Sequence, residues 1–109
     1  MEAKATLRYI RISPRKVGVV CDLIRGKSVA QAMNILALTP KAAAEPLAKL
    51  VKSAAANAEN NHGMDPEKLY VSTCFVAPGP IMKRIRFVSR AGVHRIEKRT
   101  SHITVAVSE

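Results

Sequence analysis

The side chains with the clearest chemistry in this sequence are the cations of residues 80–102, PIMKRIRFVSRAGVHRIEKRTSH. One residue of this stretch, Glu97, is acidic, and seven are basic: Lys83, Arg84, Arg86, Arg90, Arg95, Lys98 and Arg99. An arginine side chain donates paired hydrogen bonds to neighbouring phosphate oxygens, which suits it to polyanions. The chemistry that this stretch offers is therefore the binding of phosphate groups.

Positive charge is segregated along the chain rather than spread over it. Residues 1–27 hold seven basic and two acidic residues, residues 28–79 hold four of each, and residues 80–102 hold seven and one. Two basic segments around a neutral middle are typical of a protein that binds a polyanion. The alternative is a basic face that is merely solvated, but seven cations on one arm repel each other unless a partner neutralises them.

The residues that could support catalysis are scattered. His62, His94 and His102 lie far apart in the sequence, and a histidine among arginines is more often a neighbour of phosphate than a catalyst. Cys21 and Cys74 lack the paired spacing of a disulfide framework or a zinc site, and both are expected to lie in the core. We therefore expect no enzymatic activity, no metal site and no cofactor.

Helix-start signals recur in the first half of the chain. Ser13-Pro14 predicts a helix that ends near Gly26, because serine caps free N–H groups and glycine adopts the left-handed conformation. Ser28 and Gln31 have the spacing of a capping box, which predicts a second helix. The expected buried faces consist of residues at helical spacing: Val17, Val20, Cys21 and Ile24 in the first helix, and Val29, Ala32, Met33 and Leu36 in the second.

A third and longer helix is predicted over about residues 40–60. Thr39-Pro40 repeats the combination of cap and proline, and Pro46 is expected to cause a kink or a late start. The small residues 53–58 are expected to allow close approach of another backbone, of protein or RNA, and tight helix packing is the favoured use. The apolar stripe of this helix comprises Leu47, Leu50, Val51, Ala54 and Ala58.

Two further segments have the composition of strands. Residues 5–12 are expected to bury Leu7, Tyr9 and Ile10. Residues 69–76 are expected to alternate strictly, so that one face is formed by Leu69, Val71, Thr73 and Phe75 and the other by Tyr70, Ser72, Cys74 and Val76. On this interpretation Tyr9, Tyr70 and Phe75 belong to the core.

The basic stretch is anchored by two apolar strands, residues 69–76 before it and residues 103–107 after it, in which Ile103, Val105 and Val107 share a face. Pro78-Gly-Pro80 is expected to bend or bulge the chain rather than to end the strand. The stretch has too few apolar residues for a core of its own, so it should form a hairpin arm that reaches roughly 30 Å at about 3.3 Å per residue.

The expected fold class is therefore α+β. Three helices pack on a small antiparallel sheet of about three strands, and a long β-hairpin protrudes. The 109 residues are expected to form a single domain. Its body comprises about residues 1–78 and 103–109, and its arm comprises about residues 79–102.

Structured RNA is the expected partner of the arm. Aromatic residues make up 4% of the chain, which is few for a protein that stacks single-stranded bases, and no basic recognition helix or zinc finger is found. Contacts to phosphates, sugars and shape are therefore favoured over a base code. Protection of a sheet edge explains one or two lysines but not five arginines. A free DNA-binding regulator is the remaining alternative.

Five motifs carry a resemblance to a known family: Ser13-Pro-Arg-Lys-Val17, Asp22-Leu-Ile-Arg-Gly-Lys27, Ala54-Ala-Ala-Asn-Ala58, Gly79-Pro-x-Met-Lys-Arg84 and Lys98-Arg-Thr-Ser-His-Ile-Thr-Val105. Together they resemble, essentially from end to end, the universal large-subunit ribosomal protein family numbered twenty-two in the bacterial scheme. The resemblance implies a compact body on the outside of the large subunit. It also implies that the hairpin threads ribosomal RNA and that its tip lines the nascent-peptide exit tunnel.

The basic segments and the resemblance together indicate the binding residues. The expected RNA contacts are Arg8, Arg11, Ser13, Arg15, Lys16, Arg25, Lys27, Lys83, Arg84, Arg86, Arg90, His94, Arg95, Lys98, Arg99, Ser101 and His102. The expected tunnel tip comprises Val88, Ser89, Arg90, Ala91 and Gly92. The implied partners are large-subunit ribosomal RNA, neighbouring large-subunit ribosomal proteins and the nascent polypeptide, with the chain a monomer within the ribosome.

The tip departs from the pattern of the family. Family members commonly carry Pro-Arg-Ala-x-Gly-Arg where this chain has Phe87-Val-Ser-Arg-Ala-Gly92. The length is kept, so the reach of the arm is expected to be kept.

No apolar run approaches the roughly 18 residues of a membrane span, and the N-terminus lacks the apolar core of a signal peptide. The expected location is a ribosome, cytoplasmic or organellar, with no membrane partner.

Overall fold

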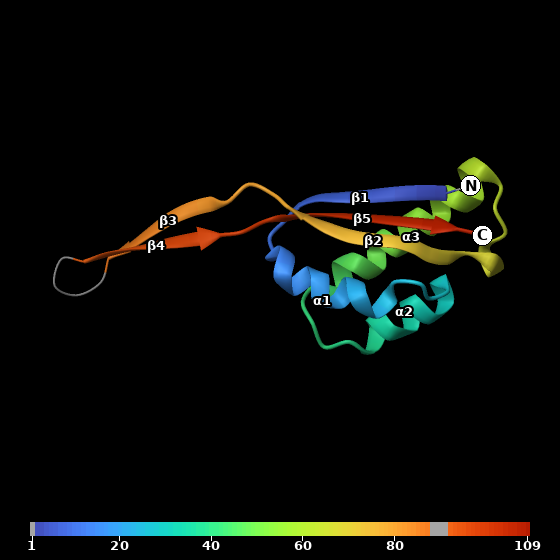
Figure 1. The fold of residues 1–109 in the computed structure, drawn as a ribbon, viewed down its shortest axis with the longest axis horizontal. Helices are drawn as coiled ribbons and strands as arrows, with labels where there is room; N and C mark the ends of the chain where they lie inside the picture. The colour runs from blue at the N-terminus through green and yellow to red at the C-terminus, as the bar shows by residue number, and fades with distance from the viewer. Residues whose placement is uncertain (1, 88–91) are drawn as a thin grey trace.

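The computed structural model describes residues 2–87 and 92–109. The elements follow in the order β1 (Glu2–Ile10), α1 (Pro14–Ile24), α2 (Val29–Leu38), α3 (Ala44–His62), a 3-10 turn η1 (Pro66–Lys68), β2 (Tyr70–Pro78), β3 (Met82–Phe87), β4 (Val93–Lys98) and β5 (Ser101–Ser108). An antiparallel sheet has the strand order β1-β5-β2, and β3 and β4 pair in a second sheet. The helices cover one face of the first sheet, and the β3–β4 hairpin projects from its end (Figure 1). The predicted α+β fold with a protruding hairpin is confirmed.

The core lies between the helices and the three-stranded sheet. The predicted apolar faces of α1 and α3 are buried, as are Ile103, Val105 and Val107 on β5. In α2, Ala32 and Leu36 are buried, while Val29 and Met33 pack against the core from its margin. α3 packs on β1, and both elements bury alanines: Ala54 and Ala58 on α3, and Ala3 and Ala5 on β1.

Helix ends follow the local signals in α1 and α2. α1 begins at Pro14, and Gly26 takes a left-handed φ of +80° just after its end. The Ser13 side chain makes no capping hydrogen bond, so proline alone marks this start. At α2, the backbone N–H of Gln31 donates to the Ser28 hydroxyl oxygen at 3.2 Å, which is one half of the predicted capping box.

The start of α3 corrects one prediction. Thr39 does not cap α3 but ends α2, where its hydroxyl donates to the Ile35 carbonyl oxygen at 2.6 Å. α3 begins late, at Ala44, and Pro46 lies in its first turn. A proline is tolerated there because the N–H groups of the first turn have no helical acceptor.

Two bulges overturn the predicted strand faces. The pairing of β1 with β5 shifts between Leu7 and Ile10, and Tyr9 has a φ of +59°. The pairing of β2 with β5 shifts between Val71 and Thr73, so that Val71 and Cys74 both point inward. An extra residue in a strand sends the following side chains to the opposite face.

The aromatic side chains were consequently misplaced in the sequence-based prediction. Tyr9 is 65% exposed, Phe75 49% and Tyr70 40%, so none of the three is a core residue. The prediction for Leu7 and Ile10 was also too strong, because both are half-buried at the margin of the core.

The prolines at the root of the arm end a strand, contrary to prediction. β2 stops at Pro78 and β3 begins at Met82. A proline lacks the N–H group that a sheet ladder needs. One hydrogen bond continues the ladder beyond Pro78: the Gly79 N–H donates to the Thr100 carbonyl oxygen at 2.9 Å.

Candidate nucleic-acid interface

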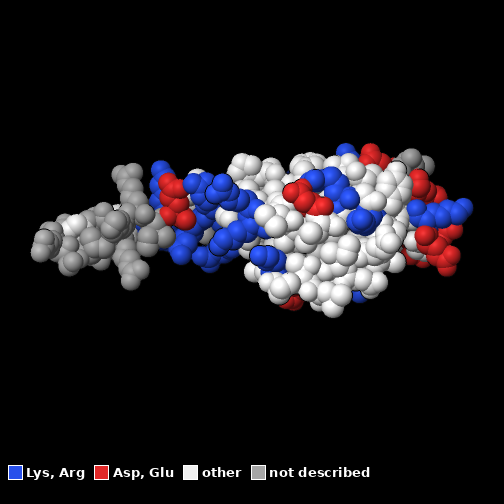
Figure 2. Space-filling model, turned by 60° about the horizontal axis from the view of Figure 1, so that its bottom comes forward, with Lys and Arg blue, Asp and Glu red and all other residues white. Residues whose placement is uncertain are grey.

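A basic groove lies where the arm leaves the body. It has a volume of about 660 Å³ and is lined by Arg11, Ile12, Ser13, Lys16, Ala42, Glu97, Lys98 and Arg99. A neighbouring opening shares Ser13 and Arg99 and adds Arg15. Figure 2 shows Lys and Arg side chains gathered over this junction, whereas acidic side chains gather at the far end of the body. The fold thus brings together cations from the two basic segments of the sequence.

The start of α1 makes the groove attractive to an anion. The first turn of α1 contains no acidic residue and instead carries Arg15 and Lys16. Cations at this end of a helix oppose the helix dipole at a cost of about 0.3–1 kcal/mol each. An anion in the groove offsets that cost, because it interacts favourably with the side chains and with the positive end of the helix dipole. The arrangement therefore suits a phosphate group.

The arm carries cations on both of its faces. Lys83 and Arg84 are consecutive and exposed on β3, and successive residues of a strand point to opposite faces. Lys98 continues the basic surface on β4. The carboxylate of Glu97 contacts Arg99 at 3.0 Å in an exposed ion pair of little energetic weight. A polyanion that neutralises this ribbon must contact it from two sides.

Most of the predicted contact residues of the body and of the proximal arm are exposed: Arg8, Arg11, Arg15, Lys16, Lys27, Lys83, Arg84, Lys98 and Arg99. Ser13 is half-buried at the groove. Arg86, His94 and Arg95 belong to strands β3 and β4. Of the predicted tip, Val88, Ser89, Arg90 and Ala91 lie outside the described residues, and Gly92 directly precedes β4.

Three predicted contact residues hydrogen-bond to residues far from them in the sequence. Ser101 is fully buried and its hydroxyl donates to the Ile12 carbonyl oxygen, so its prediction as an RNA contact was wrong. The Arg25 guanidinium donates to the Cys74 carbonyl oxygen at 2.7 and 3.2 Å. It also contacts the Asp22 carboxylate at 2.6 Å. The Nδ1 atom of His102 accepts the backbone N–H of Tyr9 at 3.1 Å.

The two cysteines lie in the core, as predicted, and their thiols contact each other. The hydrogen bond from Cys74 lowers the pKa of Cys21, whereas the same bond and burial raise the pKa of Cys74. Both thiols are free.

Within residues 2–87 and 92–109, no group of three or more His, Cys, Asp and Glu residues is arranged to hold a metal ion. None of the helices in these ranges is long and apolar enough to cross a membrane.

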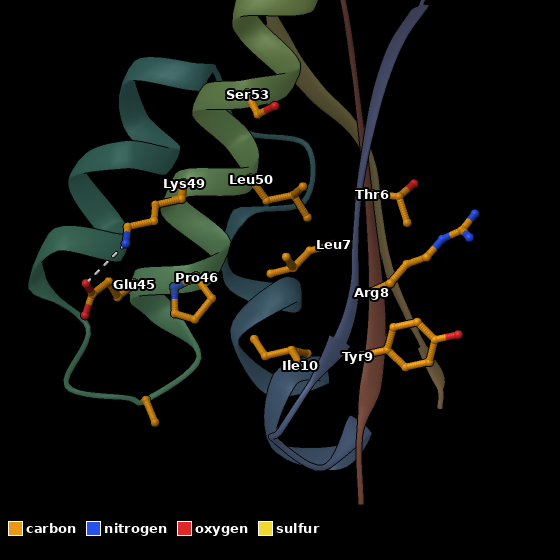
Figure 3. A pocket seen from close by; sticks show the side chains of 11 residues that line it. Thr6, Leu7, Arg8, Tyr9, Ile10, Glu45, Pro46, Lys49, Leu50 and Ser53 are labelled. Carbon is orange, nitrogen blue, oxygen red and sulfur yellow. Dashed lines mark ion pairs between the residues drawn. The ribbon is translucent and has the colours of Figure 1, made fainter. Parts of the chain in front are cut away.

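A second groove, of about 650 Å³, runs between the edge strand β1 and the start of α3. Figure 3 shows Leu7, Ile10, Pro46 and Leu50 between α3 and β1. Lys49 and Glu45 pair at 3.7 Å on the side of α3 that faces away from β1. Thr6, Arg8 and Tyr9 project from the other side of β1, away from α3. The bulge in β1 thus turns two neighbouring residues, Arg8 and Tyr9, toward the open face of the sheet.

Comparison with known proteins identifies the family. Residues 5–108 match the family described as ribosomal protein L22p/L17e. The chain belongs to this family. It is 56% identical over its whole length to "Large ribosomal subunit protein uL22" of Clostridioides difficile, of which it covers 98%, and 59% identical to that of Pelotomaculum thermopropionicum, of which it covers 96%. It covers 69% of the longer uL22 of Thermotoga sp., at 56% identity.

Membership of the uL22 family decides the broad class of function. The chain is a ribosomal protein of the large subunit, with a structural role in translation rather than an enzymatic one. Membership of this family favours a ribosomal protein over the alternative of a free DNA-binding regulator. The resemblance that the five sequence motifs indicated is confirmed.

Proposed function

We propose that this chain binds large-subunit ribosomal RNA, aids the assembly of that RNA, and extends the β3–β4 hairpin so that its tip lines the nascent-peptide exit tunnel. The observation that carries the proposal is the ribbon of cations on both faces of the arm, continuous at its root with the basic groove at α1. A ribbon charged on two sides is suited to passage through RNA, which offers phosphate groups in every direction.

In this proposal the body and the arm of the single domain have different roles. The body, about residues 1–78 and 103–109, holds the core and presents the groove. The arm, about residues 79–102, has cations in place of a core, and an isolated two-stranded hairpin is marginally stable in water. RNA packed around the arm supplies the missing contacts.

The proposed contact residues are the exposed cations of the groove and arm, joined by Arg86, Arg90, His94 and Arg95 farther along the hairpin. Val88 to Gly92 form the proposed tunnel tip. The further partners are neighbouring proteins of the large subunit and the nascent polypeptide, with one copy of the chain in each cytoplasmic ribosome.

Sedimentation tests the assembly role. An affinity-tagged chain expressed in a bacterium that lacks its own uL22 should migrate with large subunits and with complete ribosomes in a sucrose gradient. Purified chain should bind large-subunit ribosomal RNA with an affinity that falls steeply as salt is raised. A chain that stays at the top of the gradient, or binds duplex DNA equally well, would contradict the proposal.

A further inference from the structure

Three aromatic rings lie on the open face of the three-stranded sheet, the face that the helices leave uncovered. Tyr9 on β1 and His102 on β5 meet edge to face, with ring centroids 4.9 Å apart. Thr104, two residues beyond His102, pairs with Phe75 on β2. Because residues two apart on a strand share a face, Phe75 belongs to the same surface as His102. A protein core does not account for these rings, since Tyr9 and Phe75 are 65% and 49% exposed.

The backbone holds Tyr9 in this exposed position. Its φ of +59° is unusual for a residue with a large side chain, and Tyr9 is the one non-glycine residue with positive φ in the part of the chain that the structure describes. The hydrogen bond from its N–H to Nδ1 of His102 fixes the turn of the strand. Conformations of this kind persist where the surrounding structure determines them, and they concentrate at functional sites.

The surroundings of Tyr9 indicate the chemistry of a ligand. Arg8 precedes it on the same side of β1, and Arg11, two residues beyond it, lines the basic groove. The open face is therefore continuous with the proposed RNA interface. An exposed ring beside cations matches an unpaired nucleotide, whose base offers a flat face and whose phosphate offers negative charge.

We propose that Tyr9 is a stacking platform for an unpaired base of the ribosomal RNA, with Arg8 and Arg11 beside it to contact the flanking phosphates. This inference rests on the proposed RNA-binding function and adds a base contact to an interface otherwise built from phosphate contacts. An apolar segment of a protein is the competing occupant of such a face, and the test separates the two.

The test measures the affinity of the full chain for large-subunit ribosomal RNA at several salt concentrations. Replacing Tyr9 by alanine or leucine should weaken binding about 5- to 150-fold, the range for loss of one base–aromatic stack. Tyr9→Phe should bind within about twofold of the parent, because stacking uses the ring and not the hydroxyl. The slope of log affinity against log salt should stay unchanged in all three variants, because no cation is lost.

Tyr70 provides the matched control. It is exposed on the same sheet but at the opposite end of β2 from the arm, so Tyr70→Ala should bind RNA like the parent. The chain has two tyrosines and no tryptophan. In a Tyr70→Phe variant, tyrosine fluorescence therefore reports on Tyr9 alone, and RNA should quench it. Unfolding of each variant by urea establishes that the body remains folded.

The outcomes separate this inference from the proposed function. If Tyr9→Ala binds like the parent while Arg84→Ala weakens binding, the stacking platform is overturned and RNA binding stands. If Tyr9→Leu also retains affinity but Tyr9→Ala fails to enter large subunits, the face binds an apolar protein segment and the inference is overturned. If the parent chain does not bind ribosomal RNA, both proposals fall.

Discussion

Gly79 and Thr100 face each other where the two sheets of the molecule meet. The Gly79 N–H donates to the Thr100 carbonyl oxygen at 2.9 Å, and the Thr100 hydroxyl donates to the Pro80 carbonyl oxygen at 2.6 Å. Thr100 is 5% exposed, so this contact is part of the packed body. The pair fixes the direction in which the arm leaves the sheet.

Replacing Gly79 by alanine should therefore destabilise the protein. The new Cβ would lie 2.6 Å from the Thr100 hydroxyl oxygen and 3.2 Å from Nε2 of His102. Thr100 cannot move away without losing its hydrogen bond to Pro80. We expect the free energy of unfolding to fall by about 1–3 kcal/mol, the usual range for overpacking. Urea denaturation of the isolated chain measures this change.

Gly18 supplies the matched control for Gly79. It lies within α1, and a Cβ there would meet Cγ1 of Val76 at 3.7 Å, an ordinary contact. Since glycine disfavours a helix interior, Gly18→Ala should raise the free energy of unfolding by about 0.5–1 kcal/mol. If both variants lost a similar amount of stability, the root of the arm would not be more closely packed around Gly79 than α1 is around Gly18.

Arg25 is expected to stabilise the body rather than to bind RNA. Its guanidinium joins the end of α1 to the Cys74 carbonyl of β2 and to Asp22. Arg25→Ala should lower the free energy of unfolding by about 1 kcal/mol, since a partly buried hydrogen bond is lost. The salt dependence of RNA binding should stay that of the parent. A reduced salt slope with unchanged stability would restore Arg25 to the RNA interface.

Local signals in the sequence were sufficient for the helices and the fold class. The starts of α1 and α2 and the apolar stripe of α3 depend on residues within a few positions of each other. The arm was predictable because charge and the absence of apolar residues are properties of a single stretch. The resemblance carried by the five motifs implied the same compact body and long hairpin.

Long-range pairing limited the rest of the prediction. The exposure of Tyr9 and Phe75 follows from bulges that appear only when β1 and β2 pair with β5. Ser101 lies in a family motif and was expected to contact RNA, but the carbonyl oxygen that its hydroxyl binds belongs to Ile12, 89 residues away in the sequence. The contact between Cys21 and Cys74 likewise joins elements that only the fold brings together.

The cysteine pair should show opposite shifts in two single variants. In Cys74→Ala, the pKa of Cys21 should rise, because the hydrogen bond that lowers it is lost and burial remains. In Cys21→Ala, the pKa of Cys74 should fall, because its largest raising cause is removed, while burial holds it above 9.0. Thiolate absorbance near 240 nm during an alkaline titration of the folded protein follows both shifts. If each remaining thiol titrated in its variant as it does in the parent, the two thiols would not interact.

The arm cations should contribute individually to the salt dependence of RNA binding. Arg84→Ala should reduce the slope of log affinity against log salt by roughly 0.7–0.9, the value for one phosphate contact. Stability of the body should stay unchanged, because Arg84 is exposed and lies outside the core. Lys68→Ala, at the opposite end of the body, is the charge-matched control and should retain the parent slope. An identical loss in both variants would indicate a general effect of net charge.

The final prediction concerns the tip of the arm. Phe87 and Val93 are paired across β3 and β4, so residues 88–92 can be replaced by Asn-Gly, which closes a hairpin in a two-residue turn. The shortened chain should still enter large subunits, because the cations of the groove and of the proximal arm remain. The passage of nascent chains through the tunnel should change, and a stalling assay with purified ribosomes measures it. The control is Arg90→Ala, which keeps the length of the arm and removes one charge. If the shortened chain folds but fails to enter subunits, residues 88–92 serve assembly, and the proposed place of the tip in the tunnel is wrong.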